Sequence, residues 1–324
     1  MKPRNSVILL VTLFAVILSS CAPAAPASPT LEPTQPIVVA EPSPVPPQPI
    51  VLTDSLGREV SFTQPAQKIV STAPSNTEIL FAIGAGDQVV ARDDFTNYPE
   101  EAVNLPTIGG MSGFNLEAIT ALQPDLVLAA EINTPEDVKA LEDLGITVFM
   151  LPNPTDLDGL YTNLLNVGKM TGHEAEAAAL NEVLKVRVDA VTTALAGVET
   201  RPVVLYELDG SDPSKPWTSG PGTFIDLLIK MAGGENAAGA VDSAWVQLSL
   251  EEIIVIDPDF VLLGDSIWGM TPEMVTQRAG WDVLSAVKNG NVLPFNDDTV
   301  SRPGPRLVEG LEELAKILHP DLVK

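Results

Sequence analysis

The longest regular pattern of apolar residues in the chain lies between Gly172 and Gly197. Leucine and valine recur there at steps of four, four, three and four residues, at Leu180, Leu184, Val188, Val191 and Leu195. That spacing puts all five on one face of an α-helix. Thr171 and Glu174 have the spacing of a capping box, and Gly197 stands where a helix C-cap belongs. We therefore predict one long helix over residues 172–197.

The sequences on either side of this segment resemble each other. Residues 115–128 align with residues 249–262 without a gap, and seven of the fourteen positions are identical. Each copy has a capping residue (Asn115, Ser249), a short helical stretch, a Pro-Asp turn and an apolar strand. The separation of 134 residues is too long for a solenoid repeat, so the pattern predicts two related lobes joined by the long helix.

Short apolar runs alternate with helical patterns in both halves. In the first half we expect strands at 68–71, 89–91, 126–129 and 146–151, and helices at 77–83, 135–144 and 157–170. In the second half we expect strands at 202–208, 260–263 and 291–295, and helices at 223–232, 272–278 and 304–318. A hairpin over 51–62, turning at 54–57, is expected at the edge of the first lobe. This alternation predicts two α/β lobes, 51–171 and 198–324, with mostly parallel sheets and a cleft at the carboxyl ends of the strands.

The first fifty residues are predicted to lie outside the folded body. Residues 1–20 have a positive start and an apolar run that ends directly before Cys21, which resembles a bacterial lipoprotein signal. Cys21 is the only cysteine, so its lipidation leaves none for a disulfide, a thiol nucleophile or a metal site. Residues 22–50 hold ten of the 29 prolines, a composition typical of an extended tether. We expect an extracytoplasmic lipoprotein anchored to the cell membrane, at the cell surface or in a periplasm.

The net charge of the chain and the catalytic motifs that it lacks reduce the number of function classes to consider. The net charge of −25 argues against binding nucleic acid or anionic lipid, although acidity also serves solubility alone. The two histidines, His173 and His319, fall at predicted helix ends, and the sequence contains no H-E-x-x-H, G-x-S-x-G or Walker motif. We therefore expect a monomeric binding protein with no catalytic residues, cofactor or resident metal. An extracytoplasmic enzyme and a ligand-free surface adaptor remain the alternatives.

Two repeated glutamates, Glu117 and Glu251, each lie two residues after a predicted helix cap. The helix dipole stabilises a carboxylate there, and this alone can explain both residues. Because the repeat places one glutamate on each lobe, the pair also suits a symmetric partner that presents two basic points.

Aromatic and polar residues of the second lobe are candidates for ligand contact. Trp217 and Trp245 occur in loop-like contexts, where they either stack on a ligand or fill local core. For Trp268 and Trp281 we favour the core. Asp298 and Arg302 follow the last predicted strand and either hydrogen-bond a polar ligand or pair with each other.

The body resembles the periplasmic-binding proteins that serve ABC importers of cobalamin, haem and iron–siderophores. The resemblance covers nearly all of residues 53–322. It rests on the motifs Ser71-Thr-Ala-Pro-Ser-Asn-Thr-Glu-Ile-Leu, Asn97-Tyr-Pro, Gly113-Phe-Asn-Leu-Glu-Ala-Ile, Trp217-Thr-Ser-Gly, Ala232-Gly-Gly-Glu-Asn and Arg302-Pro-Gly-Pro-Arg306. It implies a class III substrate-binding protein of the helical-backbone metal/vitamin receptor type: two Rossmann-like α/β lobes bridged by a single long helix. In that family matched glutamates, here Glu117 and Glu251, dock on a dimeric permease that works with ATPase subunits.

Within the family, the chain is most similar to the cobalamin binders. The implied ligand contacts fall on Ser75, Asn76, Phe95, Tyr98, Met111, Trp217, Trp245, Asp298 and Arg302. Phe95 lacks the hydroxyl of the aromatic usual at its position, Met111 keeps only apolar bulk and Ala130 keeps neither, which leaves room for a related corrinoid. The alternative ligands are haem, for which Tyr98 would have to supply the iron ligand, and a ferric siderophore, for which Arg302 is the one basic candidate.

Overall fold

The computed structural model of this chain describes residues 49–110 and 113–323. These residues belong to one compact unit that begins at Pro47. The predicted signal, Cys21, almost all of the predicted tether and Met111 lie outside the described residues. Across the part of the chain that is described, no helix is both long enough and apolar enough to cross a membrane.

The first lobe contains a four-stranded parallel sheet in the order β4-β3-β7-β8. Its strands are β3 (Ile69–Ser71), β4 (Val89–Ala91), β7 (Leu126–Ala130) and β8 (Val148–Leu151). Its longer helices are α1 (Pro74–Ala82), α3 (Leu116–Leu122), α4 (Pro135–Glu142) and α5 (Leu157–Thr171). Smaller elements are η1 (Gly86–Gln88), α2 (Glu100–Val103), β5 (Gly109–Gly110) and β6 (Gly113–Phe114). Helix α1 begins three residues before the predicted start, because proline is tolerated in the first helical turn.

The predicted hairpin is confirmed as β1 (Ile50–Thr53) and β2 (Glu59–Phe62), which form a separate antiparallel pair. The buried Asp54 carboxylate accepts hydrogen bonds from the backbone N–H groups of Leu56 and Arg58, both at 3.0 Å. Burial acts to raise the pKa of Asp54, but Arg58 outweighs it and the pKa is lowered. The Asp54 carboxylate therefore stabilises the turn by hydrogen bonds to the backbone of the turn itself.

The second lobe has a six-stranded mixed sheet. Strands follow the order β12-β10-β9-β13-β14, with β11 also pairing β9. They are β9 (Val203–Asp209), β10 (Trp217–Ser219), β11 (Glu235–Asn236), β12 (Trp245–Gln247), β13 (Phe260–Leu263) and β14 (Val292–Pro294). The helices are α7 (Phe224–Met231), α8 (Leu250–Ile256), η2 (Gly264–Trp268), α9 (Pro272–Thr276), η3 (Trp281–Val283), α10 (Ser285–Asn289), α11 (Asp298–Ser301) and α12 (Leu307–Leu318).

The loop prediction for Trp217 and Trp245 is wrong. Both residues lie in short strands, and β10 runs antiparallel to both of its neighbours, β9 and β12. Strands of three residues are too short to produce a readable alternation of apolar and polar positions in the sequence.

The sequence repeat has the same structure in both lobes. Helices α3 and α8 each end at a non-glycine residue in the left-handed region, Gln123 and Asp257, both with φ of 49°. In the following Pro-Asp turns, the Asp125 carboxylate accepts hydrogen bonds from two backbone N–H groups just before β3, at 2.8 and 2.9 Å. Asp259 accepts one from the first residue of β9 at 2.8 Å. Each Pro-Asp turn therefore ties its own strand to the start of the neighbouring strand.

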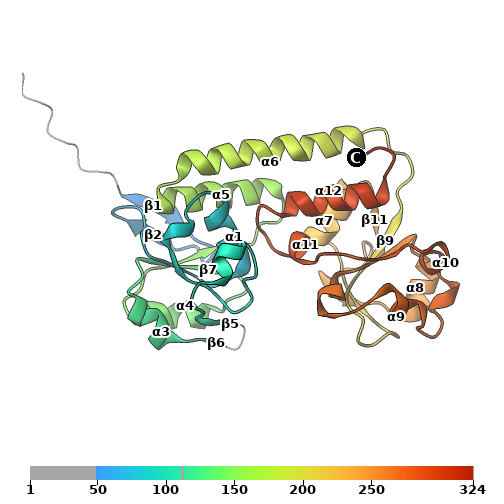
Figure 1. The fold of residues 1–324 in the computed structure, drawn as a ribbon, viewed down its shortest axis with the longest axis horizontal. Helices are drawn as coiled ribbons and strands as arrows, with labels where there is room; N and C mark the ends of the chain where they lie inside the picture. The colour runs from blue at the N-terminus through green and yellow to red at the C-terminus, as the bar shows by residue number, and fades with distance from the viewer. Residues whose placement is uncertain (1–48, 111–112, 324) are drawn as a thin grey trace, which may run out of the picture. The chain divides into compact units, whose positions relative to one another are not determined.

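The long helix is confirmed as α6 (Glu174–Ala194), which runs from the first lobe to the second (Figure 1). Its length is about 32 Å, at roughly 1.5 Å per residue. Leu184, Val188, Val191 and Leu195 are buried in the main core, and Leu180 packs against that core, as predicted. The helix packs on α5 in the first lobe and on α12 in the second.

Both predicted ends of this helix are wrong. Thr171 is the last residue of α5, where its hydroxyl donates to the Val167 carbonyl oxygen at 2.9 Å. Gly172, at φ of 79°, terminates α5, so His173 rather than Thr171 occupies the N-cap of α6. At the other end the C-cap is Leu195, two residues before Gly197.

Candidate functional site

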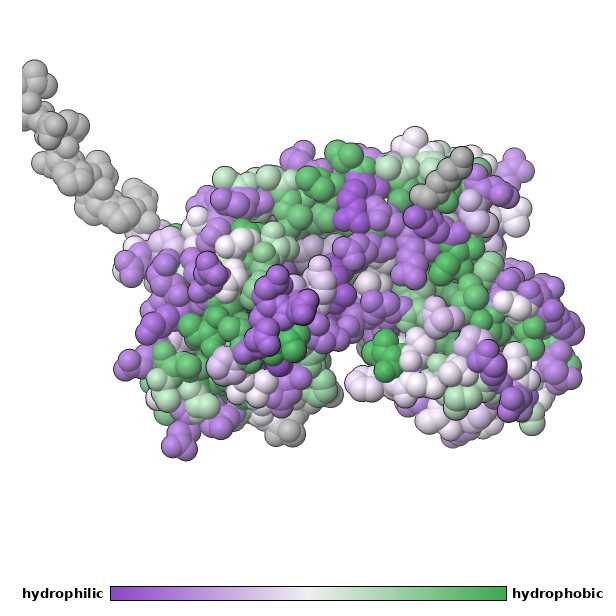
Figure 2. Space-filling view, viewed as in Figure 1, coloured by the Kyte–Doolittle hydropathy of each residue, from purple (hydrophilic) through white to green (hydrophobic). Residues whose placement is uncertain are grey.

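A cavity of about 740 Å³ lies between the two lobes. In the first lobe its wall follows the carboxyl ends of β3, β7 and β8, and in the second lobe it includes residues after β13 and β14. Figure 2 shows the notch between the lobes, with hydrophobic residues on both sides of it. The cavity confirms the expected cleft at the strand ends, where the loops of α/β sheets present side chains to ligands.

Six of the nine predicted ligand contacts line this cavity: Ser75, Asn76, Phe95, Trp245, Asp298 and Arg302. Tyr98 and Trp217 are half exposed but are not among its lining residues. Met111 lies outside the described residues. The roles of these residues in ligand binding stay predictions.

The first-lobe wall is held rigid by hydrogen bonds to the backbone. The Asn76 amide nitrogen donates to the Leu128 carbonyl oxygen at 3.0 Å, and the Asn163 amide nitrogen donates to that of Pro152 at 2.8 Å. Both side chains line the cavity, so both bonds fix polar groups at its surface.

Phe95 reaches the cavity on a loop that Asp93 organises. The Asp93 carboxylate accepts hydrogen bonds from the Phe95 backbone N–H, at 2.7 Å, and from the Thr96 hydroxyl. Burial raises the pKa of Asp93 in spite of these bonds. The Phe95 ring lies against Gly110, where a Cβ atom would come within 2.8 Å of it. Phe95 stays 46% exposed, which leaves its ring accessible from the cavity.

The second-lobe wall carries exposed aromatic surface. Trp245 is 53% exposed and Trp268 is 79% exposed, and both line the cavity with Ile267. The core prediction for Trp268 is therefore wrong, whereas that for Trp281 is confirmed. Trp281 is fully buried, and its indole nitrogen donates to the Pro213 carbonyl oxygen at 3.0 Å. Exposed tryptophans that face a cavity offer stacking surface to a planar ligand.

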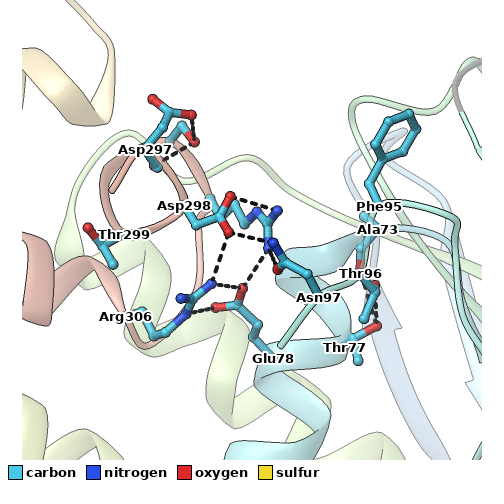
Figure 3. Close-up of polar contacts among 12 residues, drawn as sticks. Ala73, Thr77, Glu78, Phe95, Thr96, Asn97, Asp297, Asp298, Thr299 and Arg306 are labelled. Atoms are coloured by element: carbon cyan, nitrogen blue, oxygen red, sulfur yellow. Dashed lines mark hydrogen bonds and ion pairs between the residues drawn. The ribbon is translucent and has the colours of Figure 1, made fainter. Parts of the chain in front are cut away.

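A polar network joins the lobes beside the cavity (Figure 3). The Glu78 carboxylate accepts two hydrogen bonds from Arg306, from Nε at 2.9 Å and from Nη2 at 2.6 Å. Arg302 forms an ion pair with Asp298 at 2.7 Å and donates to the Glu78 carboxylate at 3.3 Å. We call these residues, together with Asn97, the Glu78 network.

Asn97 closes the network from the first lobe. Its side-chain oxygen accepts a hydrogen bond from Arg302 Nη1 at 2.7 Å, and its side-chain nitrogen donates to Asp298 at 2.9 Å. The prediction that Asp298 and Arg302 pair with each other is therefore confirmed. Both residues also contact the first lobe, through Asn97 and, for Arg302, Glu78.

A second carboxylate, Asp297, anchors the loop that carries Asp298. It accepts hydrogen bonds from the Tyr206 hydroxyl at 2.9 Å and from the Ser301 hydroxyl at 2.7 Å. Burial raises the pKa of Asp297, and these two bonds oppose that rise.

Three residues of the Glu78 network and two apolar lining residues were not predicted as site residues. Glu78, Asn97 and Arg306 occur in the motifs that carry the family resemblance, but nothing local marks them as partners. Ile132 and Trp268 line the cavity with 66% and 79% of their surfaces exposed. An apolar residue that follows a strand can be buried in the core or can line the cleft. The sequence alone does not distinguish these two positions.

Neither histidine lines the cavity. The ring nitrogens of His173 and His319 lie 3.1 and 3.2 Å from the backbone oxygens of Thr171 and Gly233. No histidine, tyrosine, cysteine or methionine occurs among the lining residues in the described ranges. Those ranges also contain no group of three or more histidine, cysteine, aspartate or glutamate residues arranged to hold a metal ion.

The repeated glutamates remain exposed in the first turns of their helices. Glu117 lies in α3 and Glu251 in α8. In α8 the capping box is formed by Ser249 and Glu252, so Glu251 has no part in it. Their proposed role in docking stays a prediction.

Comparison with known proteins shows which proteins are similar to this chain. A family model described as periplasmic binding protein matches residues 69–299. The chain is 32% identical over 276 residues to an uncharacterised ABC transporter substrate-binding lipoprotein of Bacillus subtilis, covering 84% of this chain and 86% of that protein. It is 32% identical over 304 residues to a cobalamin-binding protein of Halobacterium salinarum, covering 91% of this chain and 80% of that protein.

Solved structures share the fold. A periplasmic haem-binding protein from Roseiflexus matches with a TM-score of 0.72 and 27% identity, covering 79% of this chain and 98% of that chain. The predicted fold class, two α/β lobes bridged by one long helix, is thereby confirmed.

Proposed function

Because the chain belongs to the periplasmic binding protein family, we propose that it is the solute-binding lipoprotein of an ABC importer and that it binds cobalamin or a related corrinoid. In this proposal the protein performs no chemistry. It captures the ligand between its lobes and delivers it to a dimeric permease with ATPase subunits. Lipidation at Cys21 would keep it at the outer face of the cell membrane, as the lipoprotein name of one relative supports.

The charges and polar groups of the residues that line the cavity support this choice of ligand. Three carboxylates, Glu131, Asp297 and Asp298, line it against a single cation, Arg302, within the described residues. Arg302 is already paired with Asp298 and Glu78. This balance disfavours an anionic ligand, since like charges in a poorly hydrated cleft repel strongly.

Neutral hydrogen-bonding groups complete the lining. Four asparagines, Asn76, Asn97, Asn153 and Asn163, stand among apolar side chains. An asparagine side chain has two N–H donors and an oxygen acceptor, so the bonds that Asn76, Asn97 and Asn163 make within the protein leave further capacity for a ligand with many amide groups at its rim. A corrinoid such as cobalamin has a large ring for Phe95 and the tryptophans and peripheral amides for the asparagines.

Haem and ferric siderophores fit the lining less well. Haem carries two carboxylates, and its iron in proteins is usually held by a side chain such as histidine, cysteine, methionine or tyrosine. The described lining offers none of these. Tyr98, the one tyrosine considered for that role, lies under the Arg306 guanidinium at 4.3 Å from its ring centre. Siderophores that rely on basic residues would find only the paired Arg302.

A calorimetric titration of the purified chain tests the ligand. We expect heat of binding with cyanocobalamin at micromolar concentration and much weaker binding of haem and of a ferric hydroxamate siderophore. No heat with any corrinoid at that concentration would contradict the corrinoid assignment. Tight binding of haem with a shifted Soret band would favour haem transport instead.

A further inference from the structure

The Glu78 network joins the two lobes through side-chain hydrogen bonds and ion pairs outside α6. We propose that Glu78 and Arg306 form a clamp that fixes the separation of the lobes before any ligand arrives and positions Arg302 and Asn97 at the cleft. The sequence motifs suggested that Asp298 and Arg302 serve the ligand. The clamp assigns the network a different primary task, and it holds whichever ligand the protein carries.

Burial shows that Glu78 and the two arginines of the network are not a solvated surface cluster, although Asn97 is exposed. The Glu78 side chain is 1% exposed, and those of Arg306 and Arg302 are 10% and 16% exposed. Arg306 is bidentate on Glu78, the arrangement with the greatest geometric specificity for an arginine and a carboxylate. A pair with this geometry defines an orientation as well as a distance between α1 and the segment before α12.

The charges of the network balance only when the lobes are together. Glu78 comes from the first lobe, whereas Asp298, Arg302 and Arg306 come from the second. Separation of the lobes would leave Glu78 without a partner and the second lobe with two arginines on one aspartate. Opening would have to exchange the two Glu78–Arg306 hydrogen bonds and the contacts of Arg302 with Glu78 and Asn97 for water together. Charge-assisted, bidentate hydrogen bonds are among the stronger ones, so the network resists opening.

The clamp also explains how Arg302 is presented to the cleft. Its guanidinium touches Asp298, Asn97 and Glu78 at once, while the side chain still lines the cavity. Burial acts to lower the pKa of Arg306, but Glu78, with Asp298 and Glu309, outweighs it and the pKa is raised. Arg306 makes the shorter, bidentate contact with Glu78, whereas Arg302 is held mainly by Asn97 and Asp298, both at 2.7 Å.

Distances between spin labels on the two lobes test the clamp in the ligand-free protein. The labels go on Glu136→Cys in α4 and Glu273→Cys in α9, both exposed, in the full chain purified in detergent. The same chain without the two added cysteines reports any label on Cys21. The variants compared are the parent, Glu78→Gln and Arg306→Lys, measured by pulsed electron resonance.

The matched control is Glu207→Gln. Glu207 and Arg278 form a second buried bidentate pair, at 2.6 and 2.8 Å, wholly within the second lobe. Removing its charge lowers stability without touching the contact between lobes. We measure the thermal midpoint of every variant, so that distances are compared only between folded proteins.

We expect Glu78→Gln to broaden the inter-lobe distance distribution and to shift its mean to longer values. Arg306→Lys, which keeps the charge but loses the second hydrogen bond, should give a smaller shift in the same direction. Glu207→Gln should reproduce the parent distribution. A Glu78→Gln distribution that superimposes on the parent would overturn the clamp. Equal broadening in Glu78→Gln and Glu207→Gln would overturn it too, because loosening would then follow from lost stability alone.

Discussion

At the residue scale, one carboxylate of the cleft, Asp297, links the stability of the protein to pH. Asp297 lines the cavity while accepting hydrogen bonds from Tyr206 and Ser301, and its pKa is raised above the ordinary value of 3.8 mainly by burial. Its neighbour Asp298 adds to the rise and Arg302 opposes it. A carboxyl group with a raised pKa in the folded state binds protons more readily there than in the unfolded chain. Its ionisation therefore costs stability at neutral pH.

We predict the effect of Asp297→Asn, which keeps the shape of the side chain and an oxygen that accepts the hydrogen bond from the Tyr206 hydroxyl. The stabilising effect of protonating Asp297 is complete below pH 3.8 and is lost as the pH rises through the raised pKa. The variant should therefore be most stable relative to the parent near neutral pH, and the difference should shrink on acidification. Across this window the two stability curves should differ in slope by at most about 1.4 kcal/mol per pH unit.

Urea unfolding between pH 3.5 and pH 7 measures this difference. Asp242→Asn, at an exposed position, is the control and should run parallel to the parent. Parallel curves for Asp297→Asn as well would mean that its ionisation is not coupled to folding.

At the scale of elements, the β10–β12 ribbon presents two tryptophans on one face. Trp217 pairs with Gln247, and Trp245 pairs with Ser219. Because strand side chains alternate between faces, Trp217 and Trp245 share a face two positions apart. Only Trp245 lines the cavity, so the ribbon extends beyond the cleft that it borders.

This geometry predicts different effects of two similar truncations. Trp245→Ala should weaken cyanocobalamin binding roughly 5- to 30-fold, as expected for the loss of about 1–2 kcal/mol from an aromatic contact. Trp217→Ala should weaken it by less than about threefold, since that is below 1 kcal/mol. Calorimetric titration of both variants measures the effect, with thermal midpoints to show that each is folded. Equal losses would mean that the ligand covers the whole ribbon face.

At the scale of the whole molecule, the repeat sets one exposed glutamate on each lobe. Glu117 and Glu251 occupy equivalent places in α3 and α8, and neither is used by the cap of its helix. A two-fold symmetric permease would meet both through equivalent basic residues, which favours a defined orientation of the bound protein. The clamp proposed above would keep the distance between these two points constant.

We predict that Glu117→Ala combined with Glu251→Ala lowers ligand uptake by cells below about a tenth of the parent level, while ligand affinity is unchanged. Loss of two charge-assisted contacts with the permease is the reason, since each is worth about 2 kcal/mol or more. The matched control is Glu136→Ala with Glu273→Ala, which removes one exposed first-turn glutamate from each lobe. Unchanged uptake in the first double variant would assign Glu117 and Glu251 to their helix dipoles alone.

Local patterns determined most of the architecture of this protein. The apolar spacing of Leu184, Val188 and Val191 required a helix with one buried face, and the alternation around it required parallel sheets. The repeat could be recognised because its capping, turn and strand residues act on neighbours a few positions away. The same locality made the ends of α6 hard to predict, because Gly172 closes the preceding helix instead of opening the next one.

Only the tertiary structure decided which side chains meet and which stay exposed. Glu78 and Arg306 are separated by 228 positions, and no local rule pairs them. Trp268 and Trp281 are the same residue type, thirteen positions apart in one lobe, yet one is 79% exposed and the other fully buried. Burial depends on what packs from elsewhere in the chain, and a cleft exists only where two lobes leave space between them. The sequence by itself therefore determined the two lobes and their helix, whereas the folded protein decided the lining of the cleft and the contact that holds it.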